Sequence, residues 1–288
     1  MRKLIAAGVV LVTPMLSPAS AADMLVKAKP VPVYNWTGWY GGVNAGYAWQ
    51  DSKTAFTGDG PDGGGTTLTD ELAINSLQAG DDAFDNHPAY RQSQRASGFT
   101  GGGQLGYNWQ LDRNWVAGFE TDLQYANNKG SELFNAPDTN GVRLSAASSH
   151  QLDWFGTLRG RIGYLISDRF LAFGTAGLAY GGTKSQASIS IIGLTGWSVG
   201  NTTQIACSGF TTCLAGSSSQ TSVGWTAGAG LEYAVLPNVT IKTEYLHIDL
   251  GDQNVKLVVQ SPATGNGFAN AKFSNAYDIV RAGMNFRY

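Results

Sequence analysis

The sequence lacks a long apolar run beyond its start. After residues 4–12, no stretch offers the roughly 20 apolar residues that a membrane-spanning helix needs. Charge is also sparse, because Asp, Glu, Lys and Arg make up only 14% of the 288 residues and the formal net charge is −2. So mild a negative charge argues against nucleic acid as a partner. The sequence therefore predicts neither a helical membrane protein nor a nucleic-acid-binding protein.

The first 21 residues have the pattern of a cleaved export signal. Arg2 and Lys3 precede the apolar run of residues 4–12, and small residues at 19–21 offer a cleavage site. We expect the mature chain to begin near Ala22, with 17 basic against 21 acidic residues once Arg2 and Lys3 are removed.

Cysteine is nearly absent. Cys207 and Cys213 are the only two, and both lie in a polar stretch. Export to an oxidising compartment favours a disulfide between them, and closing so small a loop contributes about 2 kcal/mol. A metal site needs more ligands than this neighbourhood contains, so the sequence predicts no metal site.

Aromatic residues and glycine, by contrast, are plentiful, with 8 Trp, 12 Tyr, 12 Phe and 38 Gly. Many of them fall in eight strand-like segments, which exceed the usual globular strand of about 5–6 residues. Such lengths fit a tilted membrane crossing of about 10 residues plus an extension beyond the bilayer. The segments are residues 37–50, 97–110, 114–127, 150–167, 169–181, 221–235, 239–251 and 275–288.

The connections between these segments alternate in length. Turns of two or three residues follow the second, fourth and sixth segments, at 111–113, 167–168 and 236–238. The other connections are the long stretches 51–96, 128–149, 182–220 and 252–274. Short periplasmic turns alternating with long extracellular loops are typical of outer-membrane barrels. The sequence thus predicts an all-β fold, an eight-stranded antiparallel transmembrane β-barrel over residues 37–288, with both termini in the periplasm. Residues 22–36 are expected to form a periplasmic arm.

Side chains alternate between two faces along most segments. In the third, Trp115 and Phe119 share one face while Glu120 and Asp122 share the other. The fifth segment is apolar or small on both faces. The seventh is mixed, because Leu246 and residue 248 fall on its polar face. In a soluble sheet the apolar face would meet a core, whereas in a membrane barrel it meets lipid.

Aromatic residues cluster near the segment ends, where outer-membrane barrels carry girdles at the water–lipid boundary. The alternative is edge packing in a soluble β-sandwich. The predicted girdle residues are Trp36, Trp39, Trp49, Trp109, Trp115, Tyr164, Phe170, Phe286 and Tyr288.

Charged residues on the opposite parity are expected to face the barrel interior. Because eight strands leave an interior only wide enough for side chains, these acids and bases should pair. One interpretation is a polar plug that fixes the register of the strands, and the other is a narrow ion path. The predicted network comprises Glu120, Asp122, Arg159, Arg161, Glu232, Lys242, Glu244, Arg281 and Arg287.

Several motifs resemble those of one protein family. They are the phrase YNWTGWYGGVNAGY at residues 34–47, WFGTLRGRIGY at 154–164, GWTAGAGLEY at 224–233 and the ending at 280–288. They are similar to the small surface-antigen outer-membrane proteins of rhizobium- and brucella-like alphaproteobacteria, called RopB-like or porin-like. These are relatives of the opacity proteins and of the OmpA membrane domain. The resemblance covers essentially the whole mature chain, the loops least.

The resemblance implies an outer-membrane barrel with a structural and surface-interaction role, and no catalytic residues. A small non-specific porin is the alternative, and a surface receptor for haem or a host ligand is the second. His87 and His150, in or near the predicted outer loops, are the candidate haem ligands, although no cofactor is predicted. Expected partners are outer-membrane lipid and lipopolysaccharide, a host or environmental ligand at the loops, and the barrel-assembly machinery, reached through the strand ending at Tyr288.

Overall fold

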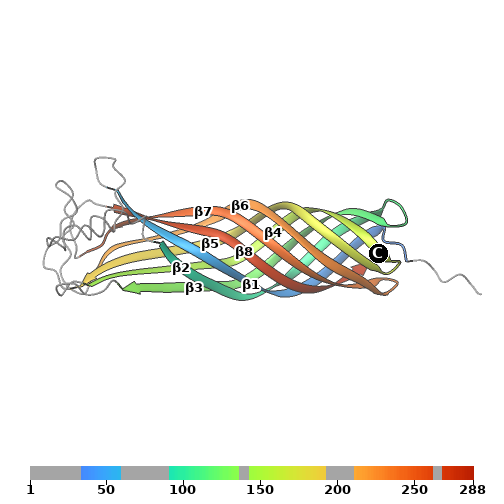
Figure 1. Ribbon diagram of the computed structural model, residues 1–288, viewed down its shortest axis with the longest axis horizontal. Helices are drawn as coiled ribbons and strands as arrows, with labels where there is room; N and C mark the ends of the chain where they lie inside the picture. The colour runs from blue at the N-terminus through green and yellow to red at the C-terminus, as the bar shows by residue number, and fades with distance from the viewer. Residues whose placement is uncertain (1–33, 60–90, 136–142, 193–210, 262–267) are drawn as a thin grey trace, which may run out of the picture. The chain divides into compact units, whose positions relative to one another are not determined.

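The computed structural model describes residues 34–59, 91–135, 143–192, 211–261 and 268–288. Each of the eight strands pairs antiparallel with its neighbours in sequence, and β8 pairs with β1, so the sheet closes into a barrel (Figure 1). The predicted fold class is confirmed. The strands are β1 (Gly38–Asp59), β2 (Arg91–Gln110), β3 (Trp115–Asn135), β4 (Arg143–Ser167), β5 (Phe170–Ile192), β6 (Thr211–Leu236), β7 (Val239–Val259) and β8 (Phe268–Arg287).

The strands are staggered around the barrel. Following paired residues from Trp39 through each strand in turn leads to Asp278 on β8, which pairs with Trp49. One circuit therefore climbs ten residues along β1. For eight strands this stagger implies a strongly tilted barrel whose interior side chains can fill.

The two ends of the barrel differ. The connections β2–β3, β4–β5 and β6–β7 are tight turns at one end, which we call the turn end. Tyr288 lies at the same end, where its backbone N–H donates to the carbonyl oxygen of Trp39 at 3.1 Å. At the opposite end, which we call the loop end, the paired strands β1 and β2, β3 and β4, β5 and β6, and β7 and β8 end together (Figure 1).

The strands extend further toward the loop end than the sequence predicted. The stretches 51–96, 128–149, 182–220 and 252–274 were interpreted as loops, yet β1 continues to Asp59 and β4 begins at Arg143. Alternation continues here with polar residues outside and smaller or apolar ones inside, as with exposed Lys53 beside buried Thr54 and Phe56. The sequence interpretation followed the outward aromatic residues, which stop earlier along each strand than the strand itself.

Candidate functional site

The interior of the barrel is built in alternating apolar and polar layers, and β4 passes through all of them. From the turn end it contributes Leu165 to an apolar layer, Arg159 to a charged layer, and Leu152 to a second apolar layer. His150 then lies in an uncharged polar layer, and Ala146 in a third apolar layer near the loop end. Each of these side chains is at most 4% exposed.

The charged layer contains eight of the nine predicted network residues. Four are acids and four are bases, so the layer has no formal net charge. Every member is 4% exposed or less, and all lie on the inward parity of their strands. They are Glu120 and Asp122 on β3, Arg159 and Arg161 on β4, Glu232 on β6, Lys242 and Glu244 on β7, and Arg281 on β8.

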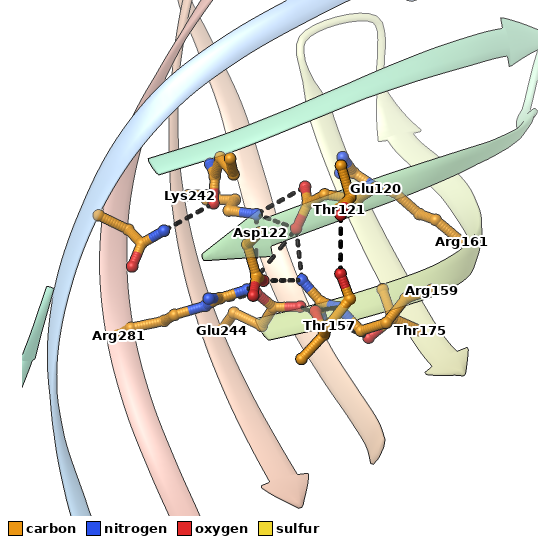
Figure 2. Close-up of polar contacts among 12 residues, drawn as sticks. Glu120, Thr121, Asp122, Thr157, Arg159, Arg161, Thr175, Lys242, Glu244 and Arg281 are labelled. Carbon is orange, nitrogen blue, oxygen red and sulfur yellow. Dashed lines mark hydrogen bonds and ion pairs between the residues drawn. The ribbon is translucent and has the colours of Figure 1, made fainter. Parts of the chain in front are cut away.

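Arg159 pairs with three of the four acids of this layer (Figure 2). One terminal nitrogen pairs with Glu120 and, at 3.0 Å, with Asp122 Oδ2 on the neighbouring strand. The other pairs with Glu244 on β7, across the interior, and donates to Thr175 Oγ1 at 3.0 Å. One guanidinium thereby bridges three strands with its fixed fork of donors.

The other bases complete the layer. Arg281 reaches Asp122 Oδ2 at 2.8 Å and Glu244 Oε2 at 2.7 Å. Lys242 Nζ lies 2.8 Å from Glu120 Oε2. Arg161 pairs with Glu232 and lies over the ring of Phe173, 4.0 Å from its centroid. Each buried charge therefore has an opposite partner, which is the condition for burying charge at acceptable cost.

Arg287 is the exception among the nine. Its position in β8 has the inward parity, but it lies at the turn end, beyond the charged layer. Its guanidinium donates to the carbonyl oxygens of Asn35 and Thr37 and lies 4.9 Å from the Tyr34 ring centroid. The prediction was wrong for Arg287 because parity gives a face and not a depth.

Trp36 is not a girdle residue. Its side chain is fully buried, and its indole N–H donates to the carbonyl oxygen of Asp168 at 3.1 Å. With Tyr34 it packs against inward residues of β3, β4, β5 and β6 in the first apolar layer. The segment before β1 thus fills the turn end. The sequence did not indicate this, because Trp36 lies outside any strand and alternation therefore assigns it no face. Desolvation raises the pKa of the Tyr34 phenol, and neighbouring Arg287 opposes that shift.

The mixed parity of the seventh segment also has a structural reason. Leu246 and Ile248 are fully buried inside the barrel, where they join Leu152, Phe155 and Tyr277 in the second apolar layer. These side chains face inward as the alternation requires, but the interior at this depth is apolar. The interior is therefore not polar throughout.

His150 does not lie in a loop. It is 2% exposed, inside the barrel, and both ring nitrogens have partners: Nδ1 lies 2.8 Å from Ser185 Oγ and Nε2 lies 2.5 Å from Tyr277 OH. Ser185 in turn donates to Gln253 Oε1 at 2.9 Å. Neither nitrogen is available to haem, so the candidate role of His150 was wrong, because β4 begins seven residues earlier than predicted.

The outward aromatic side chains form two rings. The turn-end ring includes seven of the predicted girdle residues, namely Trp39, Trp109, Trp115, Tyr164, Phe170, Phe286 and Tyr288. Trp49 lies ten residues along β1 in a second ring that the sequence analysis missed, with Tyr47, Phe99, Tyr125, Trp154, Tyr180, Trp225 and Tyr245. Ten residues tilted by about 45° span close to the 25 Å apolar band of outer-membrane barrels. The second ring could have been predicted from the sequence, because its aromatic residues share the parity of the turn-end ring and lie at a regular distance from it along each strand.

A second histidine lies on the outer surface. His247 Nδ1 is 2.9 Å from Asp278 Oδ1, and Tyr245 OH donates to the same oxygen at 2.5 Å. The ring of Trp225 packs beside His247, with the two centroids 5.3 Å apart. Within the described ranges, no hydroxyl or thiol is hydrogen-bonded to the other ring nitrogen of His247.

Two predicted sites fall partly or wholly outside the described residues. Cys213 on β6 is in a disulfide, whereas Cys207 lies outside the described residues. His87 also lies outside them. In the part of the chain that the structure describes, no group of three or more His, Cys, Asp or Glu is arranged to hold a metal ion, and no helix is long and apolar enough to cross a membrane.

Comparison with known proteins gives consistent relatives. The 31 kDa outer-membrane immunogenic protein of Brucella melitensis is 34% identical over 279 residues, which covers 94% of this chain and 93% of the relative. The 22 kDa outer membrane protein of Rhizobium leguminosarum is 29% identical, over 65% of this chain and 66% of the relative. The crystal structure of OprG from Pseudomonas aeruginosa aligns with 88% of this chain and 98% of its own, at 12% identity and a TM-score of 0.40.

The family pattern described as outer membrane protein beta-barrel domain matches residues 9–276. The predicted resemblance to the small outer-membrane proteins of brucella- and rhizobium-like bacteria is thereby confirmed. The eight-stranded barrel with its two aromatic rings agrees with that match. This chain belongs to the outer membrane protein β-barrel domain family and is an integral protein of the outer membrane.

Proposed function

We propose that this barrel does not conduct and serves the outer membrane as a structural element that presents its loops for surface interactions. The observation that carries the proposal is the layered interior, in which three apolar layers alternate with polar ones. Fully buried side chains occupy these layers, with Leu152 and Phe155 in the second and Phe273 in the third. A hydrated ion would lose its water at each apolar layer, which is costly.

The extended strands support the surface role. Beyond the loop-end aromatic ring, β1 continues ten residues past Trp49, and the third apolar layer packs inside this extension. A packed core there holds the loop end on a rigid base. The relatives whose names include outer-membrane immunogenic protein are consistent with exposure of this end at the cell surface.

The orientation and processing of the chain belong to the same proposal. The turn end faces the periplasm and the loop end faces outward, because short turns are periplasmic in such barrels. Residues 1–21 are removed on export, residues 22–36 lead into the barrel from the periplasm, and the strand ending at Tyr288 is read by the assembly machinery. Sequencing the N-terminus of the mature protein should give a start at Ala22.

Conductance in planar bilayers tests the sealed interior. The wild-type protein is expected to give no stable single-channel steps. Protection of its tryptophan fluorescence from added protease shows that it has inserted. The variant Phe155→Gly/Leu246→Gly, which thins the second apolar layer, is the control that can gain conductance. Reproducible ion-selective steps from the wild type would contradict the proposal and favour the porin alternative.

Envelope assays test the role. Cells lacking the protein should become sensitive to detergent. A barrel shortened within residues 60–90 and 193–210, the two longest connections at the loop end, should restore resistance without restoring surface interactions. Full complementation of both phenotypes by the shortened barrel would contradict a role for the loops.

A further inference from the structure

Three cationic side chains lie together on the outer surface just beyond the loop-end aromatic ring. On β1, Trp49 of the ring pairs with Ser97, and Asp51 and Lys53 follow on the same face. Asp51 pairs with Arg95 on β2, and Ser97 pairs with Lys129 on β3. The alternating parity of each strand points Lys53, Arg95 and Lys129 outward, and all three are exposed. Three adjacent strands therefore present cations at one level above the membrane band.

The charge of this cluster is only partly compensated. Arg95 Nε lies 3.1 Å from Asp51 Oδ1, but both side chains are largely exposed, at 88% and 70%. Lys53 and Lys129 form no ion pair with any described residue. By contrast, two outward lysines elsewhere at the loop end are neutralised: Lys184 Nζ lies 2.8 Å from Asp153, and Lys272 Nζ lies 2.8 Å from Asp252. Unpaired cations are thus concentrated on β1 to β3.

Two glycines lie on the membrane-facing surface directly below the cluster. On β2 the ring residue Phe99 is followed by Gly101 and Gly103 on the same face. Gly101 lies between Ala45 and Tyr125 in the sheet, and Gly103 lies between Val43 and Leu123. The ring of Phe99 lies over Gly101, whereas a side chain built at Gly103 would meet only the backbone oxygen of Gly42. Gly103 is therefore an uncovered position between Val43 and Leu123. An uncovered backbone position between two apolar side chains in the lipid-facing band can take an acyl chain.

We infer that Lys53, Arg95 and Lys129 bind the phosphates of an outer-leaflet lipid, with one of its acyl chains against the uncovered backbone at Gly103. The inference rests on the orientation proposed above, which places this cluster at the level of the outer-leaflet headgroups. Cations at the headgroup level bind phosphate without entering the apolar band, so they remain hydrated. Each adds to the binding free energy through charge attraction. A bisphosphorylated glycolipid, the headgroup class of lipopolysaccharide, matches three cations spread over three strands.

A matched pair of double variants tests the site. Lys53→Gln/Lys129→Gln removes the two unpaired lysines, and Lys184→Gln/Lys272→Gln removes two lysines already paired with acids. Both change the charge by the same amount at exposed positions. Binding of bisphosphorylated lipid A to the purified barrel in phosphatidylcholine nanodiscs is measured for each. Loss of two cations near an anionic headgroup is expected to weaken binding roughly tenfold to thirtyfold, whereas the control should stay within about twofold of wild type.

Further binding measurements distinguish a lipid phosphate from free phosphate as the ligand. Monophosphorylated lipid A should bind more weakly than the bisphosphorylated form, and inorganic phosphate should not compete. The variant Lys53→Arg/Lys129→Arg should retain binding, which distinguishes a charge effect from loss of the fold. Equal affinity of wild type and Lys53→Gln/Lys129→Gln, equal losses in both double variants, or competition by inorganic phosphate would each overturn the inference.

The orientation is tested separately. Ser93→Cys, exposed on β2 above the cluster, is labelled in intact cells with a membrane-impermeant maleimide. Labelling from outside is expected. Its failure would contradict the proposed orientation while leaving the affinity measurements on purified protein as an independent result.

Discussion

Arg159 and Glu244 form an ion pair across the barrel interior, although their strands, β4 and β7, are not neighbours in the sheet. Arg159 also pairs with Glu120 on β3. The pair therefore ties opposite walls of the barrel together, which the backbone hydrogen bonds between adjacent strands do not do. Its members are excluded from water, so each depends on the other for compensation of its charge.

Removal of Arg159 tests this dependence. Arg159→Met should lower the free energy of unfolding by roughly 3–5 kcal/mol, because it leaves buried carboxylates short of a cation. Urea unfolding in lipid vesicles, followed by tryptophan fluorescence, measures the change. Arg95→Met, at an exposed ion pair, should cost below about 1 kcal/mol. Adding Glu244→Gln to Arg159→Met should recover part of the loss, and strictly additive losses would contradict the pairing.

Charge reversal separates a plug from an ion path. Arg159→Glu is expected to destabilise the barrel without creating or altering conductance, because the apolar layers on both sides of the charged layer remain. A change in ion selectivity with unchanged stability would show instead that Arg159 lines a conducting path. Bilayer recordings and thermal melts on the same preparation provide both readouts.

Trp36 and Trp39 allow a comparison of the same residue type three positions apart. Trp36→Ala should lower stability by roughly 3–5 kcal/mol, because the side chain is fully buried in the first apolar layer. Trp39 is 49% exposed in the turn-end ring, so Trp39→Ala should cost clearly less in detergent. Equal losses would contradict the placement of Trp36 inside the barrel.

An arginine scan of β6 tests the limits of the membrane band. Ala229 faces outward between the two aromatic rings, whereas Ser217 faces outward beyond the loop-end ring, both on the same strand. Ala229→Arg should cost about 2–4 kcal/mol in a bilayer, and Ser217→Arg about 0–1. The difference should shrink when unfolding is measured in a short-chain detergent. Similar losses of unfolding free energy at both positions would contradict the placement of the membrane band between the two aromatic rings.

The sequence predicted the faces of the strands better than their depths. Alternation placed Glu120 and Arg159 inside correctly, because a side chain's face depends only on its own strand. Whether Arg159 meets Glu244 depends on the stagger of ten residues, which is a property of the closed sheet. Arg287 and Trp36 were misplaced for the same reason, since neither parity nor residue type gives a distance along the barrel axis.

Boundaries were the other weak point. His150 was expected at the start of a strand near an outer loop, and it lies in the polar layer inside. The strands outside the membrane band carry serine, threonine and glutamine where the band carries aromatic residues, so their alternation is less visible in the sequence. The interior residues Leu246 and Ile248 did carry a usable signal, because apolar side chains on an inward face indicate a packed interior.

Contacts between lipid and leucine methyl groups test the central claim most directly. Leu158 is 52% exposed on the outer face of β4, and Leu152 on the same strand is fully buried inside. In nanodiscs with protonated lipid and deuterated, methyl-labelled protein, nuclear Overhauser effects from acyl chains are expected at Leu158 and absent at Leu152. Acyl-chain contacts at Leu152, or none at Leu158, would contradict a barrel that is filled inside and faces lipid outside.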